Sequence, residues 1–438
     1  MKQTISGVFW IFFYLLVVLS PLVLIMVRPV PAGRSFWVEF SVGLGFVGLL
    51  QMAMQFFLIA RYKHLTAPYG IDLILRYHRQ IAMVALALLV AHPIILVIHD
   101  PSLAYRLNPI GGTWASRMGN LALYMLIALT LLSIFRKQLN IGYETWRVTH
   151  AILAVVTIVA AHLHVTLAGQ YINTLWKELL LLGITAGTMS FFVYLRLIKP
   201  LLQRHRPYRL ASVTPERGEV WVMELEADGH AGLSFKPGQF AWLKFGKSPF
   251  TVRENPFSFC SSPLAAGKVS FGIKAIGNFT KSLQDLPIGT RAYLDGPLGS
   301  FSIDEVPAAG YVFIAGGVGI TPFISMLKTM ADRGDPRPVL LFYGEQSLNS
   351  VAFRDDLAAL EQQLALTLVY VLTQPSEDWQ GETGYINASV LGRHLSREGF
   401  TREYFICGPN VMTDAVEDAL ETLGVSLVHI HSERFNLV

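Results

Sequence analysis

The hydrophobic positions divide the chain into two regions of different character. Residues 1–200 contain long apolar stretches with few charges, whereas after Lys199-Pro200 the apolar runs are short and alternate with glycine, proline and aspartate. A membrane-spanning helix needs about 20 predominantly apolar residues. Stretches that approach or exceed this length lie at 7–27, 36–60, 77–98, 118–135, 146–168 and 175–198. The pattern predicts a six-helix transmembrane bundle followed by a soluble region.

The soluble region contains two patterns in succession. Between 201 and 305, short apolar runs separated by turn residues are typical of antiparallel strands and predict a small β-barrel. Between 306 and 438, apolar strands alternate with helical segments, which is typical of a parallel sheet in an α/β domain. The strands expected there are 311–315, 339–343, 367–372 and 404–406, and the helices are 322–333, 351–363 and 409–423. We therefore expect three domains, at 1–200, 201–305 and 306–438.

Charged residues in the loops indicate the orientation of the spans. Basic residues concentrate after the second, fourth and sixth stretches: Arg61, Lys63, Arg76, Arg136, Lys137, Lys199, Arg204, Arg206 and Arg209. The loops on the opposite side carry fewer. Because cytoplasmic loops are enriched in Lys and Arg, we expect both termini and the soluble region in the cytoplasm of a multi-pass cell-membrane protein.

The composition agrees with a membrane protein and limits the cofactors. Of the 438 residues, 52% are hydrophobic and only 15% are charged, against about 25% charged in soluble proteins. A net charge of +4 without a basic stripe gives no indication of nucleic-acid binding. The two cysteines, Cys260 and Cys407, cannot supply the four thiolates of an iron–sulfur cluster.

Four histidines inside the apolar stretches are the strongest functional signal. His78 and His92 lie in the third stretch, His150 and His164 lie in the fifth, and both pairs are 14 residues apart. Fourteen residues bring a helix back to nearly the same face, about 21 Å along its axis. Because the third and fifth spans run in the same direction, His78 is level with His150 and His92 with His164. Two facing imidazoles at each level are what bis-histidine ligation of haem requires.

Other interpretations of these polar residues stay open. A histidine in a span can be a hydrogen-bonded packing residue, and the set could relay protons in a transporter. His162 is a second candidate for the outer level, but its 12-residue offset from His150 turns it away from that face. His64 and His99 are expected in solvated loops. Glu39, Gln51 and Gln55, in the second stretch, are expected to face the bundle interior without a redox role.

Two glycine turns in the soluble region suit a dinucleotide. Gly316-Gly317-Val318-Gly319-Ile320-Thr321-Pro322 follows an apolar strand and begins a helix, so the backbone can approach a pyrophosphate at the helix N-terminus. Cys407-Gly408-Pro409 repeats the strand–turn–helix pattern and suits a position beside a nicotinamide. The alternatives are an ordinary tight turn for the first and a buried core thiol for Cys407.

Two further segments suit a flavin. Asn255-Pro256-Phe257-Ser258 begins a strand with an aromatic ring that can stack on an isoalloxazine and a hydroxyl that can hydrogen-bond to it. Lys274, with Gly277 and Thr280, offers a cation, a glycine for close approach and a hydroxyl for a diphosphate. The alternatives are a plain strand start and a surface turn.

Taken in order, these segments resemble the ferric reductase / NADPH oxidase superfamily, in which a six-helix haem domain precedes a ferredoxin–NADP reductase-type module. The matching residues span nearly the entire chain: Tyr77-His78-Arg79, His92-Pro93, Trp146-Arg147, His150, His164, Pro237-Gly238-Gln239-Phe240, Asn255-Pro256-Phe257-Ser258, Gly277 to Thr280, Asp295-Gly296-Pro297-Leu298-Gly299, Gly316 to Pro322, Cys407-Gly408-Pro409 and Glu433-Arg434-Phe435.

The resemblance implies roles for these residues. Phe257 and Ser258 would contact the flavin ring, whereas Lys274 and Thr280 would hold the diphosphate. The loop from Gly316 to Thr321 would bind the nucleotide pyrophosphate. Cys407 would lie near the nicotinamide, and Phe435 would cover the flavin until the nicotinamide displaces it.

Two departures from the family pattern concern cofactor binding. Asn255 stands where His or Arg usually begins the flavin motif, which weakens the expected retention of FAD. Glu345 follows a strand where an arginine commonly meets the 2′-phosphate of NADPH, so NADH is an alternative to NADPH.

The function implied is a transmembrane oxidoreductase. Electrons would pass from cytoplasmic NADPH or NADH to FAD, then through an inner b haem (His78, His150) and an outer b haem (His92, His164), to a small acceptor on the opposite face. Oxygen, reduced to superoxide, is the preferred acceptor, and a ferric chelate is the alternative. A further alternative is a haem protein that reduces a second protein. The partners expected are the lipid bilayer and the acceptor, and a protein partner is compatible but not required.

Overall fold

The structure, a computed structural model, describes residues 2–27, 34–61, 70–265, 267–395 and 402–434. The chain divides into two compact units, Met1–Lys199 and Pro200–Val438. The division between the second and third expected domains, at 305, stays a prediction.

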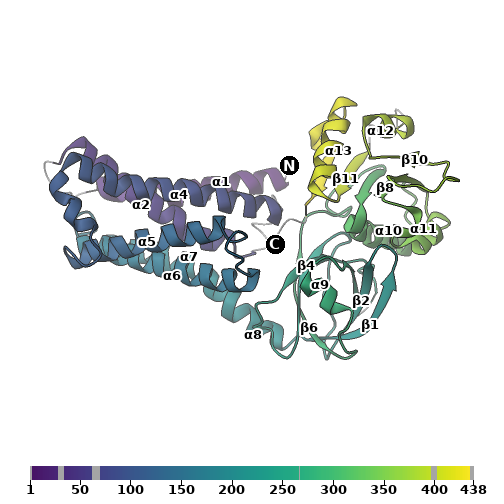
Figure 1. Ribbon diagram of the computed structural model, residues 1–438, viewed down its shortest axis with the longest axis horizontal. Helices are drawn as coiled ribbons and strands as arrows, with labels where there is room; N and C mark the ends of the chain where they lie inside the picture. Colours follow the sequence, from purple (N-terminus) through teal and green to yellow (C-terminus); the bar gives the residue numbers. More distant parts are fainter. Residues whose placement is uncertain (1, 28–33, 62–69, 266, 396–401, 435–438) are drawn as a thin grey trace. The chain divides into compact units, whose positions relative to one another are not determined.

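The first unit consists of long helices that lie side by side (Figure 1). They are α1 (Lys2–Met26), α2 (Phe36–Leu58), α4 (Ile71–His99), α5 (Trp114–Ile134), α6 (Tyr143–Ala168) and α7 (Leu175–Val193), and α7 continues through a π-helical turn (Tyr194–Ile198) into α8 (Lys199–Arg204). In the described part of the chain, six helices are long and apolar enough to cross a membrane. The predicted bundle is confirmed.

Helix α2 is the most enclosed of the six. In α2, 72% of the apolar stretch is buried, whereas in the other five helices the buried share is 28% or less. It packs against α1, α4 and α7, while α5 packs against α6. The other helices expose large apolar side chains, such as Leu15, Ile152 and Leu179. In a bilayer, the surroundings of these side chains would be apolar.

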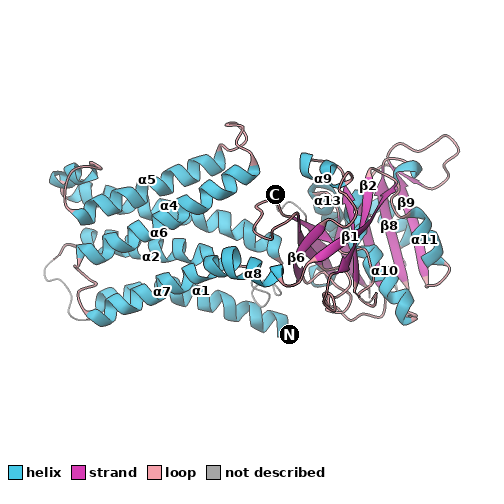
Figure 2. Cartoon of the chain, turned by 90° about the horizontal axis from the view of Figure 1, so that it is seen from below, coloured by secondary structure: helices cyan, strands magenta, loops and turns pink. Residues whose placement is uncertain are grey.

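The second unit begins with an antiparallel sheet, whose strands are drawn in magenta in Figure 2. Its strands are β1 (Tyr208–Glu216), β2 (Val220–Ala227), β3 (Phe240–Phe245), β4 (Asn255–Ser258), β5 (Lys268–Lys274) and β6 (Arg291–Leu298), in the order β4-β3-β6-β1-β2-β5.

Short antiparallel strands were predicted and are confirmed, but closure of the barrel was not confirmed. Among the described residues, the edge strands β4 and β5 are joined by the isolated bridge Phe259–Phe271 and by the bond from the Cys260 amide to the Ser270 carbonyl (2.8 Å). Because β4 ends at Ser258 and a turn begins at Ser262, only this short segment reaches β5. The sheet is therefore curled and joined at one point.

The rest of the unit is a parallel sheet, as predicted. Strands β7 (Tyr311–Gly316), β8 (Val339–Glu345), β9 (Leu366–Leu372), β10 (Glu382–Thr383), β11 (Glu403–Cys407) and β12 (Ile430–Glu433) follow the order β10-β9-β8-β7-β11-β12. Every neighbouring pair is parallel.

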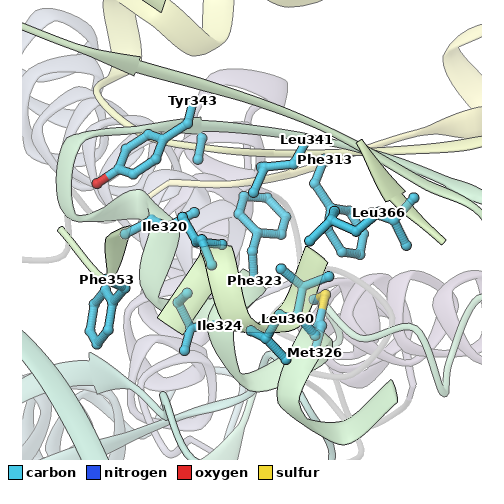
Figure 3. Packing of buried hydrophobic residues seen from close by; sticks show 14 of the residues in the cluster. Phe313, Ile320, Phe323, Ile324, Met326, Leu341, Tyr343, Phe353, Leu360 and Leu366 are labelled. Carbon is cyan, nitrogen blue, oxygen red and sulfur yellow. The ribbon is translucent and has the colours of Figure 1, made fainter. Parts of the chain in front are cut away.

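Alternate side chains of the parallel sheet face two different pairs of helices. On one face, Phe313, Leu341 and Tyr343 pack against α10 (Thr321–Arg333) and α11 (Arg354–Glu361), as Figure 3 shows for Phe323, Ile324 and Leu360. On the other face, residues such as Ile314 and Phe342 pack against α12 (Ala388–His394) and α13 (Asn410–Thr422). This burial on both faces holds the loops after β7, β8 and β11 at one edge.

Candidate functional site

The four predicted histidines form two facing pairs between α4 and α6. The ring centroids of His78 and His150 are 6.3 Å apart with the planes inclined by 57°, and those of His92 and His164 are 6.4 Å apart at 65°. Two metal–imidazole bonds of about 2.0 Å, plus the two ring radii, span roughly 6 Å. Each pair therefore has the separation that one metal ion between two imidazoles requires.

Neighbouring helices hold the Nδ1 atoms of three of these rings. Nδ1 of His92 lies 2.9 Å from the Ser41 carbonyl oxygen on α2, and Nδ1 of His164 lies 2.7 Å from the Ala115 carbonyl oxygen on α5. A carbonyl oxygen only accepts, so these rings carry their proton on Nδ1 and leave the Nε2 lone pair for a metal. Nδ1 of His150 lies 3.1 Å from Oγ of Ser133 on α5.

Two glycines allow helices to approach the pair formed by His92 and His164 closely. A Cβ on Gly119 of α5 would stand 2.8 Å from Nδ1 of His164, and a Cβ on Gly45 of α2 would stand 3.4 Å from the His92 ring. The pair formed by His92 and His164 is thus enclosed by backbone as well as by side chains.

The remaining histidines lie elsewhere. His162 points to α7, where its Nδ1 is 3.2 Å from Oγ1 of Thr185. His99, at the end of α4, is 3.0 Å from Oγ of Ser35 through its Nε2. His64 lies outside the described residues. His164, and not His162, faces His92.

Glu39 lies in a separate polar contact, where its carboxylate accepts a bond of 2.6 Å from the Tyr171 hydroxyl. In the described parts of the chain, no group of three or more His, Cys, Asp or Glu side chains could hold a metal ion. The donor set of the bundle is therefore two pairs of imidazoles in apolar surroundings, which fits a flat iron macrocycle that supplies its own equatorial nitrogens.

In the second unit, the glycine turns meet at one point of the parallel sheet. The strand order reverses between β7 and β11, so the loops after them lie together at the carboxyl edge, where open α/β sheets bind ligands. A Cβ on Gly319 would collide with the Cys407 carbonyl group. The loops from Gly316 and from Cys407 are therefore packed backbone against backbone, and only glycine fits.

The first of these loops leads directly into a helix. Gly317 has φ +57°, a left-handed conformation that suits glycine, and Pro322 stands in the first turn of α10. The Thr321 hydroxyl donates to the Val318 carbonyl oxygen at 2.7 Å and closes the turn. Amide groups at the start of α10 and a flat glycine surface fit a pyrophosphate.

Cys407 ends β11, opposite Ala315 of β7 and Glu433 of β12. It is fully buried, and burial together with the charge of Glu433 raises the pKa of its thiol well above the ordinary value. Burial of this thiol favours its neutral form, which is a poor nucleophile.

The proposed flavin strand β4 pairs with β3, with Ser258 opposite Phe240 and Asn255 opposite Leu243. The Ser258 side chain is buried, and its Oγ has no hydrogen-bond partner among the described residues. Phe257 is half-buried beside it, and Pro256 lies between Phe257 and Asn255. An orphaned hydroxyl next to an aromatic ring fits the polar edge of a flavin.

The expected diphosphate residues follow β5. Lys274 ends β5, and its positive charge reaches Glu345 at the end of β8. Burial raises the pKa of the Glu345 carboxyl, and the charge of Lys274 opposes that rise. Around Gly277, no atom lies within 4 Å of the position of a Cβ. The Thr280 hydroxyl, in α9 (Asn278–Leu283), bonds to the Gly277 amide at 2.9 Å and so lies within its own turn. Phe435 lies outside the described residues.

Sequence reasoning missed the residues that hold the histidines. Ser41, Ala115 and Ser133 lie on helices other than those of their partners, and no local motif marks them. For Ser41 and Ala115, the one signal in the sequence is spacing. Each lies four residues before a glycine that packs against the same histidine ring.

Comparisons with known proteins match segments of both units. Residues 44–161, which contain His78, His92 and His150, match the family model described as the ferric reductase like transmembrane component. Residues 313–418, from β7 to α13, match the oxidoreductase NAD-binding domain.

Curated relatives match about half of the chain. The electron transfer component of anthranilate 1,2-dioxygenase from Acinetobacter baylyi is 30% identical over 219 residues, which are 49% of this chain and 62% of that protein. The reductase component of propane 2-monooxygenase from Rhodococcus jostii is 31% identical over 236 residues, 52% of this chain and 62% of that protein. The chain thus spans less than two thirds of the length of these relatives.

Among solved structures, the flavohemoglobin from Malassezia yamatoensis with bound FAD and heme matches with a TM-score of 0.49 and 19% identity, over 78% of this chain and 92% of that one.

The apolar helical bundle, together with the antiparallel and parallel sheets that follow it, defines a multi-pass membrane oxidoreductase with a flavin- and nicotinamide-binding reductase module. The two family matches, a ferric reductase transmembrane domain and an NAD-binding domain, follow one another along the chain as they do in the ferric reductase / NADPH oxidase superfamily.

Proposed function

We propose that the protein passes electrons from NADH or NADPH at a cytoplasmic flavin domain to an acceptor on the opposite face of the cell membrane. Two b haems would be held by His78–His150 and His92–His164, and FAD by β4 and the segment after β5. The observation that supports this proposal best is the pair of facing imidazoles at each of two levels, 6.3 and 6.4 Å apart. When bound, FAD converts a hydride into single electrons, and haem carries them one at a time.

The residues of the bundle would orient and insulate the metal sites. Hydrogen bonds from Nδ1 of His92 and His164 to backbone oxygens fix the ring planes and direct Nε2 into the space between the helices. Apolar residues of α2, α4, α5 and α6 form one buried cluster in the bundle, which would insulate the metal sites from water.

The residues of the second unit would bring the nicotinamide to the flavin. Gly316, Gly317 and Gly319 let the pyrophosphate approach the start of α10, and Thr321 and Pro322 begin that helix. Gly408 and Pro409 turn the chain away after Cys407, whose neutral thiol would lie beside the nicotinamide. The buried Ser258 hydroxyl would donate to the flavin ring. Phe435 would cover the flavin in the absence of nucleotide.

The choice between NADH and NADPH depends on Glu345. Its side chain lies at the carboxyl edge, and its Oε1 is 3.9 Å from the position of a Cβ on Gly317. A carboxylate near the pyrophosphate loop repels a 2′-phosphate, which supports NADH as a substrate alongside NADPH.

Oxygen is the acceptor that the outer loop favours. The segment Pro101–Leu107 is fixed on α5 by bonds of 2.7 Å from the Asn120 amide to the Arg106 carbonyl and from the Tyr124 hydroxyl to the Leu107 carbonyl. This loop offers no cluster of metal ligands among its described residues. A ferric chelate is the second candidate, since Arg106 supplies a cation for an anionic complex.

Purified full-length protein given NADH or NADPH, with superoxide and ferrous iron assayed separately, tests the proposal. His92→Leu and His164→Leu should each lose about half of the haem absorbance and all reduction of the external acceptor, while flavin reduction continues. The matched control is His162→Leu, on the same helix as His164 but facing α7, and it should keep both haems. External reduction that survives both ligand replacements would overturn the scheme, and wild-type protein without a Soret band would favour a proton-relaying transporter.

A further inference from the structure

The inner histidine His78 differs from the other three in its surroundings. Nδ1 of His92, His150 and His164 each lies within hydrogen-bond distance of an oxygen on a neighbouring helix. Nδ1 of His78 is buried and has no partner in the part of the chain that the structure describes. A buried imidazole N–H without an acceptor is unusual, because such groups are almost always paired in folded proteins.

The packing of α2 on α4 shows which residue lies opposite His78. The two helices pack against each other with Ser41 beside His92, and a Cβ on Gly48 would meet Leu89 and the Ala85 carbonyl oxygen. Residue numbers thus rise along α2 as they fall along α4, so the helices are antiparallel. Fourteen residues are two heptads, which return both helices to the same interface about 21 Å further along. From Ser41 and His92 this step leads to Gln55 and His78.

Gln55 has the complementary unsatisfied atom. Its side chain is only 6% exposed, and its Oε1 has no hydrogen-bond partner among the described residues. Its Nε2 donates to the Gln51 carbonyl oxygen on the preceding turn at 3.2 Å. A buried acceptor and a buried donor, both unpartnered, therefore stand at matching positions of two packed helices.

We propose that Gln55 is the positioning residue of the inner haem site, accepting a hydrogen bond from Nδ1–H of His78 through its Oε1 when that site is filled. This inference rests on the proposed haem ligation by His78 and His150. A torsional change of the Gln55 side chain forms the bond, and all four ligands then have an acceptor on a neighbouring helix. Gln55 acts through His78 and touches no reacting atom.

The hydrogen bond has an electrochemical consequence. An acceptor on Nδ1–H makes the imidazole a stronger donor to the metal, which stabilises ferric over ferrous iron and lowers the midpoint potential. Removing the acceptor raises the potential of the inner haem alone, because the outer ligands keep their own acceptors on Ser41 and Ala115.

Potentiometric titration of the purified full-length protein, followed by haem absorbance, tests this assignment. Gln55→Leu should raise the midpoint potential of one haem and leave the other unchanged. Gln55→Glu, which keeps an acceptor oxygen at the same place, should hold that potential at or below the wild-type value. Repeating the titration in His164→Leu protein, where only the inner haem is expected, identifies the haem that moves. The ferric low-spin electron paramagnetic resonance spectrum should change for the same haem.

Gln51→Leu is the matched control, because Gln51 lies one turn away on α2 and its Oε1 is likewise buried without a partner. It should leave both potentials unchanged. The assignment is overturned if Gln55→Leu keeps both haems at wild-type potentials, or if Gln51→Leu produces the same shift. If Gln55→Leu loses the inner haem, retention by Gln55→Glu supports the assignment and loss from both variants overturns it. Wild-type protein without two haems would instead contradict the proposed function.

Discussion

Gly119 lies directly against the imidazole of His164, since a Cβ at this glycine would stand 2.8 Å from Nδ1 of the ring. Real Cβ atoms essentially never approach this closely, and the ring cannot retreat without losing its bond to the Ala115 carbonyl oxygen. Gly119→Ala should therefore displace the His164 ring and lower the haem content of the purified protein by about half. The haem-to-protein absorbance ratio measures the loss.

Gly45→Ala is the control for this prediction. A Cβ there would come no closer than 3.4 Å to the His92 ring, an ordinary contact. The variant should keep nearly all of its haem. Equal loss from Gly45→Ala and Gly119→Ala would show that any added methyl group disturbs the bundle and that ring contact is not the cause.

Ser258 offers a second test, because its buried Oγ has no hydrogen-bond partner among the described residues. Ser258→Ala should leave the stability of the flavin-free protein unchanged or slightly higher, since no bond is broken. If the hydroxyl bonds to the flavin, the variant should bind FAD more weakly and reduce it more slowly. Fluorescence titration with FAD and stopped-flow reduction by NADH measure the two effects.

Ser325→Ala should behave in the opposite way. Its buried Oγ donates to the Ser261 carbonyl oxygen at 2.7 Å, so its removal should cost about 1 kcal/mol of stability. FAD binding should stay unchanged. Weakened FAD binding by both variants would remove the special role assigned to Ser258.

The helical part of the fold could be predicted from the sequence because its signals are local. Apolar length marks each span, and 14-residue spacing marks His78, His92, His150 and His164 without knowledge of the packing. The acceptors of these histidines could not be predicted. Ala115 contributes a backbone oxygen that any residue has, and Gln55 becomes opposite His78 only once the register of α2 on α4 is known.

The strands show the same division between local and distant signals. The strands β7, β8, β9 and β11 are apolar runs that the pattern predicts, whereas β10 has two residues and β12 has four, too few for a periodic signal. Closure of the antiparallel sheet depends on where β4 ends relative to β5, which are separated along the chain. The pattern of short apolar runs therefore predicted antiparallel strands but not how the sheet closes.

The two cysteines should resist alkylation in the native protein. Burial raises the pKa of the Cys260 thiol to about 12, and burial with the charge of Glu433 raises the pKa of Cys407 well above its ordinary value. Iodoacetamide reacts with thiolate, so neither residue should be modified at pH 8, and both should react after denaturation. Mass spectrometry of the labelled peptides is the measurement. Rapid native modification of Cys407 would show that the thiol is open to solvent and charged.

Glu382 links the short strand β10 to α12. Its carboxylate accepts bonds from Nε of Arg393 at 3.0 Å and from His394 at 2.8 Å, and these partners, Arg393 above all, lower its pKa from 4.5 to about 2. A carboxyl whose pKa is lowered by folding stabilises the fold above its unfolded pKa, and this stabilisation is lost as the pH falls toward 2.

Glu382→Gln should therefore lower stability at pH 7 by about 1 kcal/mol, a value reduced by solvent screening. The difference between variant and wild type should shrink as the pH falls from 4.5 toward 2. Thermal unfolding of the full-length protein at several pH values measures it. A difference that is the same at pH 7 and pH 3 would mean that the loss does not come from the charge of Glu382.

Lys244 and Glu254 form a buried ion pair that connects the flavin strand to α8. Nζ of Lys244 lies 3.4 Å from Oε2 of Glu254, 3.0 Å from the Pro249 carbonyl oxygen and 3.3 Å from Oε1 of Gln203. The side chains of Lys244 and Glu254 are only 7% and 4% exposed. Glu254 directly precedes β4, so the pair fixes the strand that is proposed to bind FAD.

Lys244→Met should cost about 3–5 kcal/mol, because it removes the cation that lies 3.4 Å from the buried Glu254 carboxylate. The double variant Lys244→Met/Glu254→Leu should recover most of that loss, since it removes both charges of the pair. Thermal unfolding of the full-length protein, monitored by tryptophan fluorescence, gives the stabilities, and FAD titration should show weaker binding for Lys244→Met alone. Lys268→Met is the control. Lys268 is half exposed and forms ion pairs with Glu224 and Glu226, so this variant should have little effect on stability. Comparable losses for Lys244→Met and Lys268→Met would mean that burial of the pair does not anchor the flavin strand.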